Sequence, residues 1–154
     1  MRETNLAIED QLTQEGYYVS TTVGMSMYPM LRDRRDRIVV TVVGEKKLKK
    51  YDLPLYKCPD GRYILHRIIG VKKDLYIIRG DNTYAKEYVP KEWILGYVSE
   101  FYREDRHILT SSKPYRLYAA LWNAIYPLRW GYMKVRGLLG AIVRRLKKQK
   151  KSKL

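Results

Sequence analysis

The sequence predicts a mainly β protein, a small antiparallel and partly open barrel or sandwich with a short N-terminal helix and amphipathic C-terminal helices. Between residues 17 and 102, five or six short runs rich in Val, Ile, Leu and Tyr alternate with turn signals, with few helical patterns between them. At 154 residues the chain has room for one domain and an appendage. We expect an N-terminal helix in residues 1–16, a β domain in 17–106, and a basic, aromatic extension in 107–154.

The predicted elements follow one another with short connections. Apolar residues at positions 6, 8 and 12, followed by Gly16, predict the first helix. The turn Pro59-Asp60-Gly61 predicts a β-hairpin, a second tight reversal follows residue 71, and Gly96 predicts a bulge or a close approach in the final strand. Strands are expected at residues 17–23, 37–43, 53–58, 62–71, 75–79 and 93–102.

The charge is distributed unevenly along the chain. Residues 1–105 contain 18 Lys and Arg and 16 Asp and Glu, whereas residues 106–154 contain 13 Lys and Arg and no acidic residue. Nearly all of the net charge of +15 therefore lies in the C-terminal third, which points to an anionic partner there, either membrane lipid or nucleic acid. Cys58, the one cysteine, excludes an internal disulfide and cannot build a zinc site alone.

The octapeptide GMSMYPML carries the candidate nucleophile, Ser26. A serine attacks a carbonyl group only if the fold supplies a base for its hydroxyl and hydrogen-bond donors for the oxyanion. Gly24 permits close approach of a substrate, Pro29 keeps the residue before it out of the helical region, and Met25 and Met27 offer an adaptable apolar wall. A turn serine beside core methionines is the alternative.

A histidine and two carboxylates downstream could complete the site. His66 lies in the apolar run YILHRII, where a core histidine is the alternative to a catalytic one. Strand alternation would place it on one face with two isoleucines. Asp81 follows in a Gly-Asp-Asn turn, where it could instead hydrogen-bond its own backbone, and Glu87 comes six residues later. A serine, a histidine and a carboxylate that orients it are the parts of an acyl-transfer site.

In their order and spacing, residues 18–102 resemble the superfamily of type I signal peptidases and self-cleaving LexA-like repressors. Gly24-Met25-Ser26-Met27 looks like the repressor form of the nucleophile motif, and Ser26-Met27-Tyr28-Pro29 looks like the signal-peptidase form. Leu65-His66-Arg67-Ile68 looks like the histidine-type base motif of the endoplasmic-reticulum and archaeal signal peptidases, and Gly80-Asp81-Asn82 matches their Gly-Asp-Asn box. The resemblance implies a Ser26 nucleophile, a His66 base, and Asp81 or Glu87 as the orienting carboxylate, with Asp81 favoured by its motif.

The chain departs from the family pattern in places. Signal peptidases carry an oxyanion-donating serine where this chain has Gly24, so the resemblance leaves backbone N–H groups, including that of Ser26, to form the oxyanion hole. Arg35-Asp36 stands where the family has Gly-Asp. The pattern before Ser26 predicts no membrane-spanning helix, which argues against ordinary preprotein processing. His107 is predicted to lie on the surface, and a Ser-Lys dyad using Lys57, Lys72 or Lys73 is the minor alternative.

The C-terminal extension is predicted to form basic amphipathic helices. Apolar residues from Val135 to Leu146 repeat at helical spacing, and Pro127 should divide the segment into two helices. No run is long enough to span a membrane, but a basic helix rich in Trp and Tyr suits the surface of an anionic membrane. Packing on the sheet and nucleic-acid binding are the alternatives. The predicted membrane contacts are Trp122, Trp130, Arg144, Arg145, Lys147 and Lys148.

The sequence thus predicts a serine endopeptidase that cleaves an extended peptide or protein substrate through a Ser-His-carboxylate acyl-enzyme mechanism, without cofactor or metal. The substrate is expected to add a strand along residues 17–24. Because the N-terminus lacks the apolar core of a secretory signal, we expect a cytoplasmic protein, bound peripherally to the inner face of the membrane. A non-catalytic peptide-binding module on the same scaffold and a self-cleaving regulator are the alternatives.

Overall fold

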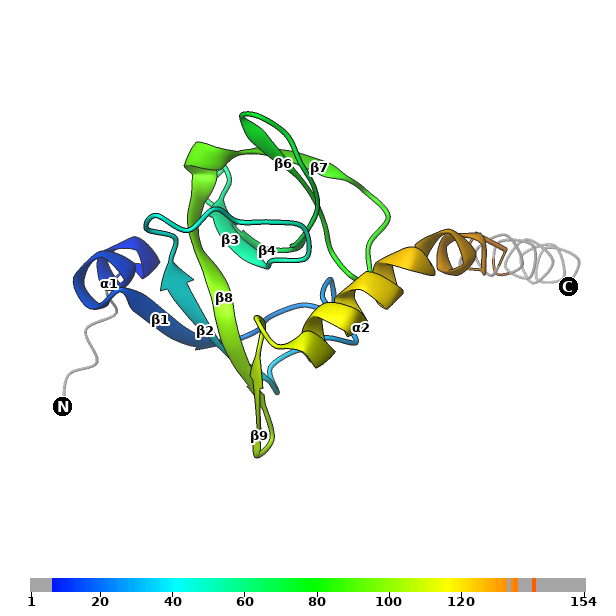
Figure 1. The fold of residues 1–154 in the computed structure, drawn as a ribbon, viewed down its shortest axis with the longest axis horizontal. Coiled ribbons are helices and arrows are strands. Elements are labelled where there is room, and N and C mark those ends of the chain that lie inside the picture. The colour runs from blue at the N-terminus through cyan, green and yellow to red at the C-terminus, as the bar shows by residue number, and fades with distance from the viewer. Residues whose placement is uncertain (1–6, 133, 136–139, 141–154) are drawn as a thin grey trace, which may run out of the picture. The chain divides into compact units, whose positions relative to one another are not determined.

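A computed structural model of the chain describes residues 7–132, 134–135 and 140 (Figure 1). The protein is mainly β, with a curled, open antiparallel sheet, a short N-terminal helix and a C-terminal helix, which confirms the predicted fold class. The elements are α1 (Ile8–Glu15), β1 (Tyr17–Thr21), β2 (Arg37–Val42), β3 (Pro54–Lys57), β4 (Tyr63–Leu65), β5 (Arg67–Val71), β6 (Leu75–Arg79), β7 (Glu87–Pro90), the 3-10 turn η1 (Lys91–Trp93), β8 (Ile94–Arg103), β9 (Arg106–Leu109) and α2 (Lys113–Ala124).

The larger sheet is open, with β1 and β4 at its two edges. Its strand order is β1-β2-β8-β3-β4, every neighbouring pair is antiparallel, and β9 is added beside the end of β8. The long strand β8 therefore joins the halves of the sheet, as Figure 1 shows at the centre of the body. A second antiparallel sheet has the order β5-β6-β7.

The strand predicted over residues 62–71 is two strands in two different sheets. β4 belongs to the larger sheet and β5 to the smaller one, and His66 is the residue between them. After the break the chain pairs with the loop before β3: Ile68 N–H donates to the Asp52 carbonyl at 2.9 Å, and Tyr51 N–H donates to the Ile68 carbonyl at 2.8 Å. The prediction of one uninterrupted strand through His66 was therefore wrong, because the partner changes at this residue.

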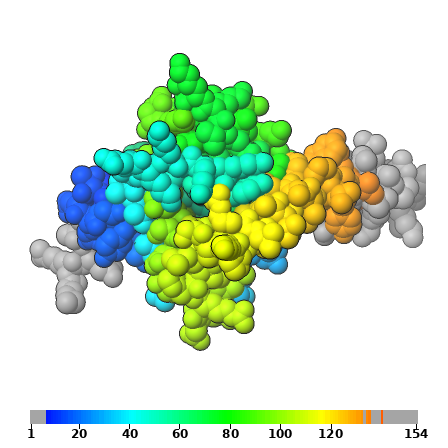
Figure 2. Space-filling model, viewed as in Figure 1, coloured from blue at the N-terminus to red at the C-terminus, as the bar shows by residue number. Residues whose placement is uncertain are grey.

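The body extends further along the chain than the sequence predicts. The chain divides into two compact units, Met1–Ala120 and Leu121–Leu154. β8 is not the last strand, because a tight turn with Glu104 at φ 56° returns the chain as β9, which carries His107. The first turns of α2 also belong to the body: Tyr115 and Ala119 are buried, and Figure 2 shows this part of the helix, in yellow, seated against the body.

Two apolar clusters hold the two sheets. The first contains residues of β2, β3 and β8 of the larger sheet and includes Leu12 of α1 and Tyr115 of α2. The second packs the smaller sheet against β3 and the loop that precedes it. Gly96 lies where strands approach closely, as predicted, since a Cβ there would come within 2.7 Å of Val40 Cγ1 and 2.8 Å of the Thr41 carbonyl oxygen. The buried members of the second cluster are Leu48, Tyr56, Ile68, Tyr76, Ile78 and Val89.

The second unit begins within α2, and its helix is interrupted close to the predicted proline. α2 ends at Ala124, a single turn residue follows, and helical backbone resumes at Tyr126. Pro127 has no N–H to donate to the carbonyl group four residues earlier, which accounts for the interruption. Among the described residues, no helix has the length and apolar character needed to cross a membrane. The predicted lipid contacts Arg144, Arg145, Lys147 and Lys148 lie outside the described residues.

Candidate active site

A groove of about 460 Å³ lies between the two edges of the larger sheet. One wall is formed by β1 and the residues that follow it, through Gly24, and the other by β4 with the preceding Arg62. Residues of β2 and β3 form an apolar floor of Ile38, Val40 and Leu55. Ser26 and His66 both line this groove, so the fold brings together the predicted nucleophile and the predicted base from positions 40 residues apart in the chain.

Asp33 fixes the start of the serine loop. The Gly24 N–H donates to Asp33 Oδ1 at 2.7 Å, and Gly24 has a φ of 99°. Nothing lies within 4 Å of a Cβ built at this glycine, so the left-handed backbone conformation, and not a close approach, requires glycine here. Because the Gly24 N–H is already bound to a carboxylate, it is not available as an oxyanion donor.

The Gly80-Asp81-Asn82 turn fixes the serine itself. The Asn82 N–H donates to the Ser26 carbonyl at 2.7 Å, and the Asn82 side-chain amide donates to the Met25 carbonyl at 3.2 Å. A Cβ at Gly80 would lie 2.7 Å from the Ser26 carbonyl oxygen, so a larger residue would push the serine loop away. The turn therefore acts on the main chain of the nucleophile loop.

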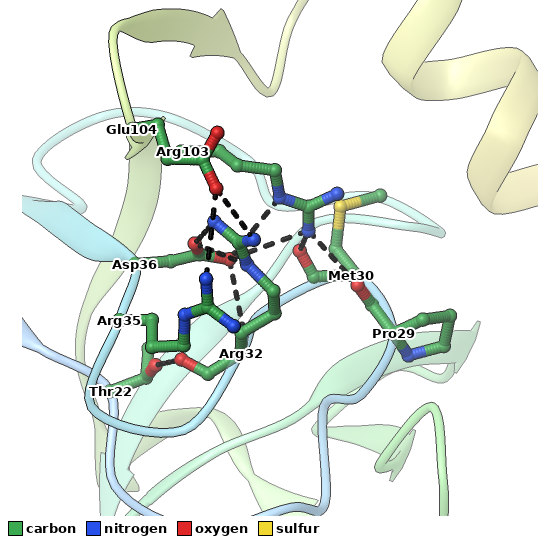
Figure 3. A network of polar contacts seen from close by, with 8 residues as sticks. All are labelled: Thr22, Pro29, Met30, Arg32, Arg35, Asp36, Arg103 and Glu104. Atoms are coloured by element: carbon green, nitrogen blue, oxygen red, sulfur yellow. Dashed lines mark hydrogen bonds and ion pairs between the residues drawn. The ribbon is translucent and has the colours of Figure 1, made fainter.

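Asp36 fixes the far end of the loop, at the center of the network in Figure 3. Its buried carboxylate accepts hydrogen bonds from the Arg32 backbone N–H at 2.9 Å and from the Arg32 guanidinium at 2.8 and 2.9 Å. Arg103, from the end of β8, lies 3.4 Å from the same carboxylate and donates to the carbonyl groups of Pro29 and Met30. This aspartate, at the position where the resemblance has Gly-Asp, thus ties the serine loop to the central strand.

His66 is oriented by Glu87 rather than by Asp81. His66 Nδ1 lies 3.0 Å from Glu87 Oε1, and the Tyr56 hydroxyl donates to the other oxygen of the same carboxylate. An ionised carboxylate only accepts hydrogen bonds. In contact with one, Nδ1 carries the proton of the neutral imidazole, and Nε2 is left as the acceptor. Glu87 begins β7, a strand that the sequence reasoning did not predict, opposite Ile78 of β6.

The site favours a neutral imidazole. Burial lowers the pKa of His66 below its usual value of 6.5, and the nearby Glu87 carboxylate opposes that shift only in part. Burial, reinforced by the Glu87 charge, raises the pKa of Tyr56, so this phenol stays protonated and remains a donor to Glu87. A neutral histidine whose Nδ1 is held by a carboxylate is the state a general base requires.

Asp81, which the motif favours as the partner of the histidine, is bound to Arg67 instead. Arg67 Nε and Nη2 each donate to one Asp81 oxygen at 2.7 Å, and both side chains are almost completely buried. Arg67 Nη1 also donates to the Tyr115 hydroxyl at 2.8 Å. Burial opposes the charge on Arg67, but Tyr115 and Asp81 outweigh it and raise the pKa of the guanidinium, so Arg67 stays charged. Expecting Asp81 on the imidazole was therefore wrong.

The other predicted substrate residues are divided between three environments. Gly24 and Met27 line the groove, and Met27 also joins the first apolar cluster. Met25 is half exposed and is not part of the groove wall. Pro29, joined to Tyr28 by a cis peptide bond, lines a separate cavity of about 560 Å³ beside α2. The methionine wall of the prediction is thus a single methionine.

The lysines of the minor alternative lie elsewhere. Lys57 Nζ is bound to Glu9 Oε1 of α1 at 2.5 Å, and the Lys73 carbonyl group, between β5 and β6, accepts a hydrogen bond from Lys91 Nζ of η1. None of Lys57, Lys72 and Lys73 is among the described residues that line the groove. His107 is a surface residue, as predicted, stacked on Tyr102 and 2.8 Å from Glu100.

Sequence reasoning missed three polar partners in the interior: Arg67, Tyr56 and Tyr115. The signal for Arg67 was present, because an arginine inside an apolar run must be paired when it is buried. The two tyrosines had no comparable signal, since a chain with 15 tyrosines gives no means of selecting them.

No protein-family model matches the chain, and the search of curated proteins finds no match. Within the described ranges, no group of three or more His, Cys, Asp and Glu side chains could hold a metal ion.

Proposed function

We propose that the protein is a serine endopeptidase, with Ser26 as nucleophile, His66 as general base and Glu87 as the carboxylate that orients it. The observation that carries the proposal is that Ser26 and His66 line one groove while His66 Nδ1 is bound to Glu87. The resemblance of the serine and histidine motifs to the histidine-type signal peptidases supports the same assignment.

The reaction follows from the tautomer of His66. Nε2 accepts the Ser26 hydroxyl proton as Oγ attacks the peptide carbonyl, and Glu87 stabilises the resulting imidazolium through Nδ1. When the tetrahedral intermediate collapses, the C–N bond breaks and Nε2 returns the proton to the leaving amine. A water molecule then attacks the acyl-enzyme, with His66 again taking and returning the proton.

The groove suits an extended substrate. Among the described strands, β1 pairs with β2 alone and β4 pairs with β3 alone, so each presents an edge to the groove. A peptide strand laid between these edges can form main-chain hydrogen bonds on both sides. Its side chains that point inward meet the apolar floor of the groove, so we expect a preference for apolar residues there.

A fluorophosphonate probe, which phosphonylates activated serines with loss of fluoride, tests the function without knowledge of the substrate. We expect wild type to take up one probe per chain, Ser26→Ala none, and His66→Ala to react far more slowly. Ser111→Ala is a matched control, because Ser111 is an exposed serine that does not line the groove, and its loss should leave labelling unchanged. Equal labelling of wild type and Ser26→Ala would overturn the proposal and favour a non-catalytic peptide-binding module.

We also propose that the protein is cytoplasmic and binds peripherally to the inner face of the membrane through the unit Leu121–Leu154. In this unit Arg129 lies over the Trp122 ring at 3.6 Å from its centroid, and Lys134 lies over Trp130 at 4.0 Å. Such pairs place a cation beside a ring that suits the headgroup region. Exposed apolar residues follow at spacings of three and four: Leu121, Ile125, Leu128, Tyr132 and Val135.

Vesicle flotation tests this location. We expect the full-length protein to float with vesicles that contain phosphatidylserine, and Leu121→Glu/Leu128→Glu to stay in the soluble fraction, because charges in the apolar stripe oppose insertion. Leu109→Glu, at an exposed position of the body, should float like wild type. Binding that both leucine substitutions leave intact, and that an oligonucleotide displaces, would instead favour nucleic acid as the partner of the tail.

A further inference from the structure

We infer that Tyr115 of α2 is a positioning residue for the Ser26 nucleophile, acting through Arg67 and the Gly80-Asp81-Asn82 turn. The inference rests on the proposed peptidase function and extends the site to a helix that lies outside the predicted β domain.

The first link is the contact between Tyr115 and Arg67. Tyr115 is 3% exposed, its hydroxyl accepts a hydrogen bond from Arg67 Nη1 at 2.8 Å, and the guanidinium carbon lies 5.4 Å from its ring centroid. The same hydroxyl donates to the Tyr51 carbonyl at 3.4 Å, and Phe101 packs against the ring at 6.4 Å between centroids. The phenol is therefore held from several sides and helps to position Arg67 Nη1, which also donates to the Tyr51 carbonyl at 3.2 Å.

The second link is the bidentate pair between Arg67 and Asp81. A planar guanidinium that donates two parallel hydrogen bonds fixes the position and the plane of the carboxylate, which a single contact would not do. Because Arg67 is completely buried, its nitrogens cannot exchange these partners for water. A displacement of the guanidinium would therefore be passed to Asp81.

The third link runs from Asp81 to the serine. Its neighbour Asn82 donates from the backbone to the Ser26 carbonyl and from the side chain to the Met25 carbonyl, and Gly80 is in contact with the same Ser26 oxygen. These contacts hold the peptide groups on either side of the Ser26 Cα. Displacing a reacting group by about 1 Å can cost about a hundredfold in rate, so a small shift of this turn should be measurable as a change in rate.

Arg116, the next residue of α2, provides a matched control. Its guanidinium binds the Asp52 carboxylate at 2.6 Å and the Lys50 carbonyl at 2.6 Å, so it also attaches α2 to the body. Neither contact involves Asp81 or the serine loop. Arg116→Met therefore weakens the attachment of the helix without removing a link of the relay.

The experiment measures the rate of fluorophosphonate labelling at saturating probe. For Tyr115→Phe we expect a first-order rate about ten- to a hundredfold below wild type, with one probe per chain at completion and the same acid limb of the pH profile, since His66 and Glu87 are untouched. Arg116→Met should label at the wild-type rate. Asn82→Ala, an exposed change at the other end of the relay, should slow labelling in the same way and covers the case in which Tyr115→Phe does not fold.

The experiment distinguishes a failure of the peptidase proposal from a failure of the positioning role of Tyr115. If wild type takes up no probe, the peptidase function itself is wrong. If wild type reacts but Asn82→Ala and any folded Tyr115→Phe react at its rate, the positioning role of Tyr115 is overturned. A lower final stoichiometry at an unchanged rate would also overturn it, because that result indicates a loss of folded protein alone.

Discussion

Two carboxylates six residues apart, Asp81 and Glu87, have opposite surroundings in this protein. The Asp81 side chain is 2% exposed and is bound to an arginine, whereas the Glu87 side chain is 32% exposed and is bound to a tyrosine and a histidine. The guanidinium never loses its proton, so the first pair cannot exchange one with a substrate. The histidine can, so in the proposed mechanism Asp81 builds the site and Glu87 takes part in the chemistry.

The separation begins at one point in the chain, where β4 leaves the larger sheet and β5 enters the smaller one. His66 and Arg67 are consecutive at this junction, and consecutive residues of an extended chain point to opposite sides. Each therefore reaches a different carboxylate, the histidine on the groove side and the arginine in the interior.

The largest expected effect is on stability, from Asp81→Asn. Removing one partner of a buried ion pair leaves an uncompensated charge on Arg67, and we expect a loss of about 3–5 kcal/mol in the free energy of unfolding, measured by urea denaturation. Because apolar residues can replace both partners at a smaller cost, Arg67→Met/Asp81→Leu should lose less than the single change. A loss below about 1 kcal/mol for Asp81→Asn would show that the pair does not hold the interior as described.

Glu87→Gln should have a large effect on the labelling rate and a small effect on stability. We expect the rate of fluorophosphonate labelling to fall about a hundredfold, because Gln cannot stabilise the imidazolium as a carboxylate does. The free energy of unfolding should stay within about 1 kcal/mol of wild type, since the Gln oxygen can still accept from Tyr56. Parallel rate and denaturation measurements on the two variants check the comparison directly, and a Glu87→Gln protein that labels normally would contradict it.

The sequence predicts which residues belong to the candidate site better than it predicts which side chains they contact. The mainly β fold, the serine loop and the histidine were found from alternation, turn residues and a short motif. The carboxylate that contacts His66 was not found in this way. Asp81 stands in the more specific motif, and its partner Arg67 directly follows the histidine. Only the change of sheet at His66 decides which carboxylate each of them meets, and that change depends on backbone pairing with Tyr51 and Asp52, which no local pattern shows.

The pH dependence of labelling sharpens the assignment of Glu87. Burial lowers the pKa of His66, so the neutral base persists, and labelling should continue, at pH values below the usual histidine value of 6.5. Glu87 opposes this shift, since its charge favours the imidazolium. Glu87→Gln should therefore move the acid limb to still lower pH while lowering the maximal rate, measured from about pH 4 to 8. An acid limb that moves to higher pH would show that another group controls the base.

A third carboxylate, Glu9 of α1, is expected to have the smallest effect. It lies on the surface, 2.5 Å from Lys57 Nζ and 2.5 Å from the Tyr63 hydroxyl, and these hydrogen bonds lower its pKa from 4.5 to about 2. A lowered carboxylate pKa contributes stability above the unfolded-state value, and this contribution disappears as the pH falls from 4.5 toward 2. Since exposed ion pairs contribute little, Glu9→Gln should lose about 0.5 kcal/mol or less at neutral pH.

The pH dependence of this small loss of stability shows whether the charge of Glu9 or its packing causes it. Urea denaturation of wild type and Glu9→Gln should give a difference that is constant above pH 4.5 and approaches zero near pH 2, because the wild-type carboxyl is then protonated as well. A difference that does not change with pH would mean that Glu9 acts through packing of α1 and not through its charge. In that case the two hydrogen bonds that join α1 to β3 and β4 would be structural, like the pair of Asp81 and Arg67, but would contribute less to the free energy of unfolding.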